Sequence, residues 1–174
     1  MGVSLRAWSL ADAPALARIC NNKKVQDNLR DGLPFPYREE DAKIFLSEML
    51  AADPDQNIAF AIEAKGVLIG SISASRCGNI HFRTAELGYY LGEPYWGKGY
   101  ATETVRLLCS YVFQHTDIIR IFAEPFAHNL ASCRVLEKAG FQLEGVLRSN
   151  AVKNGRILDM KMYARIREEW EKDQ

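Results

Sequence analysis

Residues 86–115 read ELGYYLGEPYWGKGYATETVRLLCSYVFQH, and this stretch decides the fold. Its first six residues are mostly aromatic and aliphatic, as in a strand, and the pair Glu93-Pro94 ends that pattern. A helix is then predicted to begin at about residue 100, after a glycine-rich turn. Its apolar residues recur at i, i+4, i+7 and i+11, namely Ala101, Val105, Leu108 and Val112. The stretch therefore predicts a strand, a glycine turn and an amphipathic helix.

The glycine turn is a candidate site for a phosphate group. The first N–H groups of a helix lack intrahelical partners and carry partial positive charge, and the small residues Gly97 and Gly99 would let a pyrophosphate reach them. A P-loop fits poorly, because its lysine follows the second glycine whereas Lys98 precedes Gly99. The dinucleotide fingerprint fits poorly too, because Thr102 stands where a small residue is required. A plain strand-to-helix connection is the alternative.

Length, charge and cysteine usage narrow the class of protein. The chain has 174 residues, 48% of them hydrophobic, which predicts one domain over residues 1–174. Its 22 basic and 22 acidic residues cancel, so no overall field favours nucleic acid or an anionic membrane. Four cysteines without CxxC spacing predict reduced thiols in a cytoplasmic protein. No apolar run is long enough for a membrane span or a signal peptide, and no spacing of ligands predicts a metal.

Strands and helices are predicted along the rest of the chain. Strands are expected at 3–8, 57–64, 67–73, 84–91, 118–123, 141–148 and 156–164. Helices are expected at about 9–21, 38–51, 100–115 and 129–140, with a frayed helix in the charged tail. The helix over 100–115 joins two strands, so these two are predicted to be parallel neighbours through a right-handed crossover. Lys65-Gly66 and Asn154-Gly155 are hairpin turns that favour antiparallel pairing elsewhere.

Three blocks of this sequence resemble the GNAT superfamily of acyl-CoA-dependent N-acetyltransferases, in particular the Rim-type branch that acetylates N-termini of ribosomal proteins. The blocks are AELGYYL at 85–91, WGKGYATE at 96–103, and the segment from Asn129 to Phe141 with its NLAS and LEKAGF motifs. Supporting matches are EG-LR at 144–148 and D-x-x-x-Y from Asp159 to Tyr163, so that the resemblance covers nearly the whole chain. It implies an α/β fold with one mixed, mostly antiparallel sheet of about seven strands, about four flanking helices, and a central parallel pair that splays apart.

The resemblance also implies that acetyl-CoA binds in this splay as the acyl donor. Backbone groups of the first block would contact pantetheine, at Tyr89, Tyr90 and Leu91. Amides of the second block would contact the pyrophosphate, at Gly97, Lys98, Gly99, Tyr100, Ala101 and Thr102. The family motif Q/R-x-x-G-x-G/A begins where this chain has Trp96, a departure that removes a polar side chain but no backbone amide. Asn129 would bond the cofactor near its thiol arm, unless it only caps a helix.

Two residues are candidates for the chemistry. An amine must lose its proton before it attacks a thioester, and Glu86, which shares a strand face with Gly88 and Tyr90, is the candidate base. The alternative is a carboxylate paired with an arginine. In the Rim-type branch the serine at the position of Ser132 is proposed to donate a proton to the departing CoA thiolate, and the alternative is an ordinary helix serine. Some relatives have a further glutamate in the segment 149–151, where this chain has no carboxylate.

The function that follows is transfer of an acetyl group from acetyl-CoA to a primary amine by direct attack in a ternary complex. A protein N-terminal α-amine is the first acceptor expected, and the protein would act as a monomer or homodimer. A small amine such as a polyamine or aminoglycoside is one alternative. A non-catalytic acyl-CoA sensor and a nicotinamide- or nucleotide-binding domain are the others. No partner among nucleic acids or membranes is expected.

Overall fold

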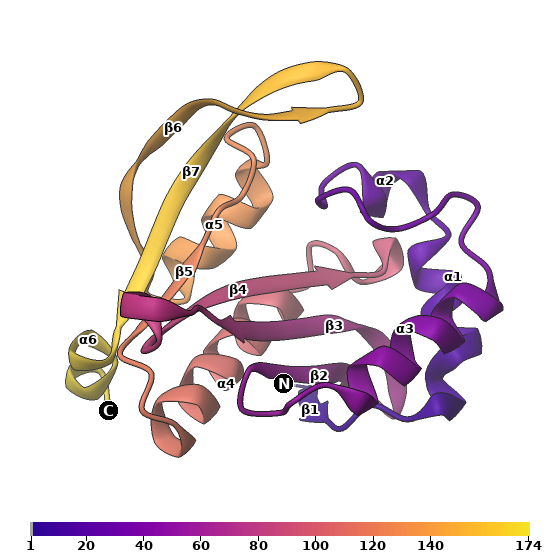
Figure 1. Cartoon of the computed structure of the whole chain (residues 1–174), viewed down its shortest axis with the longest axis horizontal. Coiled ribbons are helices and arrows are strands. Elements are labelled where there is room, and N and C mark those ends of the chain that lie inside the picture. The colour runs from indigo at the N-terminus through magenta and orange to yellow at the C-terminus, as the bar shows by residue number, and fades with distance from the viewer. Residues whose placement is uncertain (1) are drawn as a thin grey trace.

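The computed structural model describes residues 2–174 and contains one mixed seven-stranded sheet (Figure 1). The strands are β1 (Val3–Arg6), β2 (Asn57–Ala64), β3 (Val67–Arg76), β4 (Thr84–Leu91), β5 (Arg120–Ala123), β6 (Gln142–Lys153) and β7 (Arg156–Ile166). The α-helices are α1 (Ala13–Cys20), α2 (Lys23–Gln26), α3 (Glu39–Ala51), α4 (Tyr100–His115), α5 (Leu130–Lys138) and α6 (Arg167–Lys172). The strand order is β1-β2-β3-β4-β5-β7-β6, and among the strands of residues 2–174 only β4 and β5 pair in parallel. The mixed sheet and its one parallel pair are as predicted.

The predicted elements differ from the observed ones mainly in length and helix number. β1 ends two residues early, at Arg6, because a capping box of Ser9 and Asp12 starts a 3-10 turn soon after it. The last hairpin is longer than predicted and continues to the Asn154-Gly155 turn, where φ is +50° and +73°. About four flanking helices and a frayed helix in the tail are expected from the sequence, and residues 2–174 form six α-helices. The four-residue helix α2 was not predicted, and the tail forms the ordered helix α6 with a buried Trp170.

The parallel pair separates partway along β4. Only Thr84 to Glu86 pair with β5, and the last pair joins Glu86 to Phe122. Beyond that pair β4 continues to Leu91 alongside β3 alone, while β5 pairs on its other side with β7. Figure 1 shows β4 leading away from β5 and the long β6–β7 hairpin. The predicted splay is therefore present, and Glu86 lies at its vertex.

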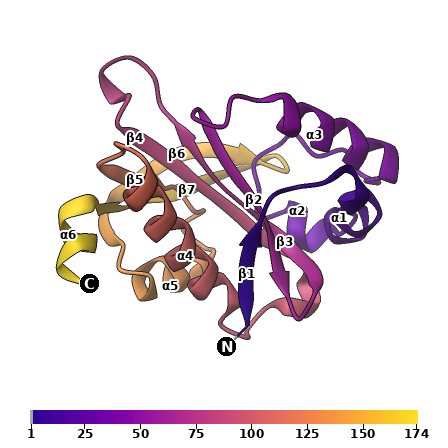
Figure 2. The same ribbon diagram turned by 90° about the horizontal axis from the view of Figure 1, so that it is seen from below.

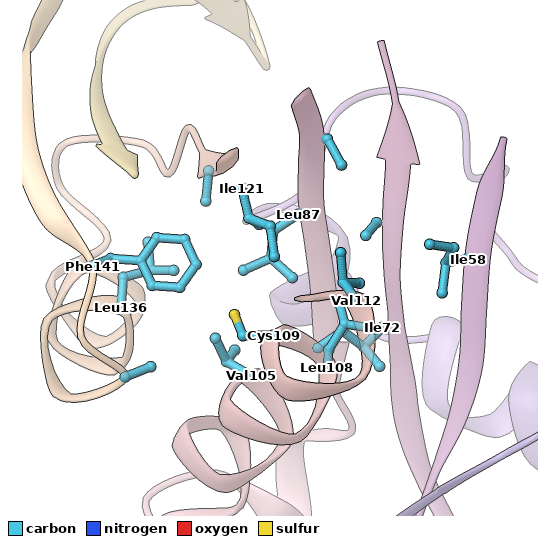
Figure 3. Close-up of a cluster of buried hydrophobic side chains, with 14 of the residues drawn as sticks. Ile58, Ile72, Leu87, Val105, Leu108, Cys109, Val112, Ile121, Leu136 and Phe141 are labelled. Carbon is cyan, nitrogen blue, oxygen red and sulfur yellow. The ribbon is translucent and has the colours of Figure 1, made fainter. Parts of the chain in front are cut away.

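Hydrophobic residues cover both faces of the sheet. On one face, alternate β4 side chains such as Leu87 pack with α4 and α5, where Val105, Leu108 and Leu136 are fully buried (Figure 3). On the other face a second cluster joins α1 and α3, with Leu16 at its centre. Figure 2 shows α4 and α5 on one side of the sheet and α1 and α3 on the other. The alternation along β4 thus directs successive side chains toward two different helical layers.

Helix α5 is fixed at both ends. At its start, the Asn129 side chain accepts a hydrogen bond from the backbone N–H of Ser132 at 3.2 Å. At its end, Gly140 adopts φ +88°, and the N–H groups of Gly140 and Phe141 donate to carbonyls of the last turn at 3.1 and 3.0 Å. This is a Schellman motif, which the sequence predicts from Gly140 followed by an apolar residue. The ends therefore hold Ser132 in a defined place beside the sheet.

Gly70 lets β3 approach β4 closely, and its replacement tests this packing. A Cβ at residue 70 would lie 2.2 Å from the Tyr90 carbonyl oxygen and 2.8 Å from a Leu91 methyl group. Gly70→Ala is expected to reduce the free energy of unfolding by about 3 kcal/mol, the upper part of the usual range for overpacking. Gly88→Ala on β4 is the matched control, because its nearest neighbour, a Ser73 oxygen, lies 3.8 Å away. Equal urea midpoints for these two variants would contradict the close approach.

Candidate functional site

The turn before α4 has a backbone that glycine favours. Gly97 and Gly99 have φ of +71° and +80°, and Gly99 is the left-handed N-cap of α4. A Cβ at either residue would meet nothing within 4 Å. The two glycines are therefore required by the backbone conformation and not by neighbouring protein atoms. Space in front of the turn is left open for a ligand.

The amides of this turn have no partners within the protein. Glu103 is the first residue of the helix whose N–H is bonded, and it donates to the Gly99 carbonyl at 3.2 Å. The N–H groups of residues 97–102 donate to no backbone or side-chain acceptor within residues 2–174. These unpaired donors stand at the positive end of the α4 dipole. A group with several anionic oxygens could accept hydrogen bonds from them.

Trp96 connects this turn to the end of β4. Its indole Nε1–H donates to the Leu91 carbonyl at 2.9 Å, and its side chain stays partly exposed. Residue 96 is the position at which the sequence departs from the family motif. The tryptophan therefore replaces a polar side chain with a group that ties the turn to the strand. Sequence alone gave no signal for this bond.

The backbone of β4 divides its hydrogen bonds between β3 and the splay. Gly92 N–H donates to the Ile69 carbonyl at 2.8 Å, so Gly92 and Ile69 form a hydrogen-bonded pair. The next pair along the ladder, Leu91 with Gly70, is therefore a pair without mutual hydrogen bonds. Because such pairs alternate along an antiparallel ladder, Tyr89 and Leu91 direct their backbone groups away from β3. Tyr90 lies between them, and its backbone takes part in the ladder. Two of the three predicted backbone contacts for pantetheine thus face the gap.

Tyr90 contributes a side chain on the α1 side of β4. Its phenol oxygen accepts a hydrogen bond from the Cys20 thiol at 3.4 Å. Burial, together with the neighbouring Cys20, raises the pKa of Tyr90 well above its usual value. The phenol is therefore uncharged at physiological pH and lines the site on this side. All four cysteines are free thiols, as the sequence predicts.

Tyr89 and Ser132 meet on the α5 side of β4. Their hydroxyl oxygens are 2.8 Å apart, and either can be the donor. Burial is the main cause that raises the pKa of Tyr89 to about 12, so the phenol keeps its proton at neutral pH. Asn129 accepts the Ser132 backbone N–H and so joins the same group. Tyr89 is thereby brought together with two residues predicted for the site that lie about 40 positions later in the sequence.

Glu86 lies in an ion-paired cluster at the vertex of the splay. A single Arg30 guanidinium nitrogen donates to Glu86 and also lies 3.2 Å from a Glu124 oxygen. The Glu86 side chain is 30% exposed, so solvent reaches it. Pairing with an arginine was the alternative to a catalytic role, and the pairing is present. Neither Arg30 nor Glu124 belongs to a sequence motif.

The candidate base and the candidate proton donor lie on opposite faces of β4. Glu86 shares its face with Gly88 and Tyr90, whereas Tyr89 and its partner Ser132 lie toward α4 and α5. A thioester threaded through the gap beside β4 would have a carboxylate on one side and a hydroxyl pair on the other. This arrangement allows proton removal and proton donation by different groups.

A cavity adjoins Glu86's partner Arg30. It has a volume of about 240 Å³ and lies between the α2–α3 segment and the tip of the β6–β7 hairpin. Two contacts bridge these parts of the chain: Lys153 Nζ lies 2.8 Å from Asp31, and the Asn154 amide donates to Asp27 at 3.0 Å. Figure 1 shows the hairpin reaching over toward α2. The tip of the β6–β7 hairpin and the α2–α3 segment therefore contact each other and enclose this cavity.

Residues 2–174 contain neither a cluster of metal ligands nor a membrane-spanning helix. No group of three or more His, Cys, Asp or Glu side chains in that range is arranged to hold a metal ion. None of the helices described there combines the length and hydropathy needed to cross a bilayer.

Known proteins share both this sequence and this fold. Among relatives, the chain is 39% identical to the probable N-acetyltransferase YjcK of Bacillus subtilis over 108 residues, which span 62% of this chain and 60% of that protein. It is 38% identical to the uncharacterised N-acetyltransferase p20 of Bacillus licheniformis over 170 residues, or 97% of this chain and 94% of the relative. Among solved structures, RimL, described as a ribosomal L7/L12 α-N-protein acetyltransferase in complex with coenzyme A, superimposes with a TM-score of 0.84 at 25% identity. That comparison covers 95% of this chain and 94% of RimL.

A family model supplies the assignment. The model described as an acetyltransferase (GNAT) domain matches residues 3–142, which include β4, the glycine turn, α4 and α5. The matched range contains all the residues predicted for the site. With this match and the full-length likeness to p20, the chain belongs to the GNAT family of acetyltransferases.

Proposed function

We propose that the protein transfers an acetyl group from acetyl-CoA to a primary amine, and that the preferred acceptor is a protein N-terminal α-amine. The observation that carries the proposal is the row of unpaired amides over residues 97–102, placed next to a splayed strand pair. RimL, whose fold this chain shares, is described as an α-N-protein acetyltransferase and holds coenzyme A. In the proposed role residues 1–174 act as one domain in the cytoplasm, where ribosomal N-termini are made.

The donor would lie along β4 with its pyrophosphate on the glycine turn. Amides from Gly97 to Thr102, including those of Lys98, Tyr100 and Ala101, would bond the phosphate oxygens. Backbone groups of Tyr89 and Leu91 would contact the pantetheine arm in place of the missing β5 partner, with Tyr90 as a wall. Asn129 would orient the arm near the thiol while it caps α5. Acetyl-CoA supplies the thioester; every other group comes from this chain.

Glu86 would act as the base toward the acceptor. An α-amine has a pKa near 7.7 to 8.0, so a sizeable fraction is protonated at neutral pH and must lose a proton before attack. Glu86 can take that proton, directly or through water, on the oxygen that Arg30 does not bond. The neutral amine then attacks the thioester carbonyl, and the collapsing intermediate expels the CoA thiolate.

Ser132 would assist the departing thiolate. Its hydroxyl can donate a hydrogen bond to the sulfur, and the Tyr89 phenol, 2.8 Å away, can in turn donate a hydrogen bond to the Ser132 oxygen. A hydrogen bond to a charged group contributes about 1.5–3 kcal/mol. This is worth about 10- to 100-fold in rate if it is made only in the transition state.

Ser132→Ala is therefore expected to lower kcat by about 10- to 100-fold with little change in the KM for acetyl-CoA. Tyr89→Phe should have a smaller effect, because it removes only the second hydrogen-bond donor. Initial rates of thiol release measure both. Ser47→Ala, at an exposed position of α3, is a control helix serine and should leave the rates unchanged. Wild-type kcat in Ser132→Ala would show that this hydroxyl does not serve the leaving group.

A thiol-release screen tests the acceptor class. The purified protein is given acetyl-CoA with peptides that match ribosomal N-termini, with the same peptides after N-terminal blocking, and with polyamines and aminoglycosides. Turnover with free but not blocked N-termini is the expected result. Four carboxylates around the cavity and the vertex, Asp27, Asp31, Glu86 and Glu124, outnumber the three cations there, Lys23, Arg30 and Lys153, by one. This excess of negative charge is the observation that favours a small cationic amine as the second candidate. Binding of acetyl-CoA without turnover of any amine would favour a sensor.

A further inference from the structure

We infer that Arg30 acts through Glu86 as a cation that competes with the acceptor amine for the Glu86 carboxylate. The inference rests on the proposed function, in which Glu86 is the base. It adds a specificity-determining residue from the α2–α3 segment, outside every motif that the sequence shares with the family. Its consequence is that the Arg30 ion pair weakens acceptor binding at Glu86.

The first step is the location of the ion pair. The last β4–β5 pair joins Glu86 to Phe122, and Glu124 follows β5, so both carboxylates stand where the splay opens. One Arg30 nitrogen serves both of them. Arg30 bonds one oxygen of Glu86, and no partner within residues 2–174 bonds the other, so an acceptor ammonium would reach the carboxylate as a second cation beside the guanidinium. Like charges this close repel each other, and the guanidinium and the substrate therefore compete for the same carboxylate.

The second step is that the Arg30 side chain can leave without unfolding the segment. The side chain is 61% exposed, and exposed ion pairs of this kind add little stability. On either side of it in the sequence, Asp27 is bonded to Asn154 and Asp31 to Lys153, so the backbone is held by the hairpin tip. Displacement is then a rotamer change, which exposed side chains make within nanoseconds.

The third step is that a second position exists for the guanidinium. The cavity of about 240 Å³ is lined by Arg30 itself and by Asp27 and Asp31. A guanidinium that leaves Glu86 can turn toward these carboxylates instead of losing all partners. The segment thus offers Arg30 two sets of acceptors, one at the vertex and one in the cavity.

Steady-state kinetics of Arg30→Gln and Arg30→Lys test the inference in the active enzyme. Arg30→Gln removes the competitor, so the KM for the acceptor should fall by about threefold, within the range expected for an exposed ion pair. Its kcat and the KM for acetyl-CoA should stay unchanged. Arg30→Lys retains a cation and should restore the wild-type KM. Arg83→Gln, which removes an arginine paired with Asp117 outside the site, is the matched control and should change neither constant.

A purely structural role for Arg30 would give a different pattern. Loss of its contacts in Arg30→Gln would then lower kcat or raise the KM for the acceptor. Arg30→Lys would not return the acceptor KM alone to the wild-type value. An unchanged or raised acceptor KM in Arg30→Gln, in an enzyme that turns over normally, would overturn the inference while leaving the proposed function intact.

A binding measurement keeps the test independent of turnover. The probe is Nα-acetyl-arginine N-methylamide, which carries a guanidinium but no acetylatable amine, and its glutamine analogue is the control probe. In an NMR titration Arg30→Gln should bind the arginine probe, with shifts at Glu86 and Glu124, at least about threefold more tightly than the wild type. Equal binding to both proteins would overturn the inference even if no amine proved to be a substrate. If Arg30→Gln binds the arginine probe more tightly but neither protein acetylates any amine, the inference stands and the proposed function is wrong.

Discussion

Replacing Glu86 by glutamine is expected to lower kcat by about 10²- to 10⁴-fold, the range that a general base contributes. Glutamine keeps the size of the side chain and can still accept a hydrogen bond from Arg30, but it cannot accept a proton from the acceptor amine. Acetyl-CoA should bind to Glu86→Gln as it binds to the wild type, because the predicted phosphate contacts lie at the far end of β4. Initial rates and calorimetry on the same preparation measure the two quantities.

Glu144→Gln controls for the loss of an ion pair as such. Glu144 is paired with Arg120 through two bonds, one of them 2.9 Å long, and it lies on β6 away from the vertex. Its replacement should leave kcat within about twofold of the wild type, as is usual for an exposed pair. If Glu86→Gln and Glu144→Gln have equal, wild-type rates, Glu86 is not the base and a water chain must deliver the proton elsewhere.

Gly99→Ala is expected to weaken CoA binding by about 10- to 100-fold, the second large effect. An L-residue at φ +80° is strained by about 1–2 kcal/mol, and relief of that strain turns the amides of residues 97–102 away from their present directions. Each lost hydrogen bond to a phosphate is worth about 1.5–3 kcal/mol. Isothermal titration with CoA measures the change in Kd.

Gly66→Ala separates backbone strain from ligand binding. Gly66 has φ +76° in the β2–β3 turn, and a Cβ there also meets nothing within 4 Å. The two alanine variants should therefore lose similar amounts of stability, while only Gly99→Ala loses affinity for CoA. Wild-type affinity in a folded Gly99→Ala protein would show that this turn does not hold the pyrophosphate.

Local patterns were enough to predict most of the fold. The bounds of β4 and α4 follow from the aromatic run before Glu93-Pro94 and from the apolar spacing after Gly99, and both were predicted to the residue. The Asn154-Gly155 hairpin and the Gly140 helix stop were likewise encoded in a few neighbouring residues. Helix α2 was not predictable in this way, because four residues hold no full period and its order depends on an Asn22 cap and on contacts with other elements.

The site was predictable where a motif is local and not where contacts are long-range. The unpaired amides after Gly97 follow from sequence, since a helix start always leaves such donors. The Tyr89–Ser132 bond joins residues 43 apart, and the pairs of Arg30 with Glu86 and Glu124 join residues 56 and 94 apart. No spacing rule relates such positions; the fold alone brings them together. The bond from Trp96 to Leu91 is short in sequence but depends on a turn geometry that residue types do not specify.

The most direct measurement is isothermal titration of the wild-type protein with CoA and, in parallel, with pantetheine, which has the same thiol arm but no pyrophosphate. Binding of CoA with a Kd between about 1 μM and 1 mM, the usual range of substrate constants, is predicted, with pantetheine at least about 100-fold weaker. Equal affinity for both ligands, or no heat with CoA at millimolar concentration from properly folded protein, would contradict a diphosphate site on the amides of residues 97–102.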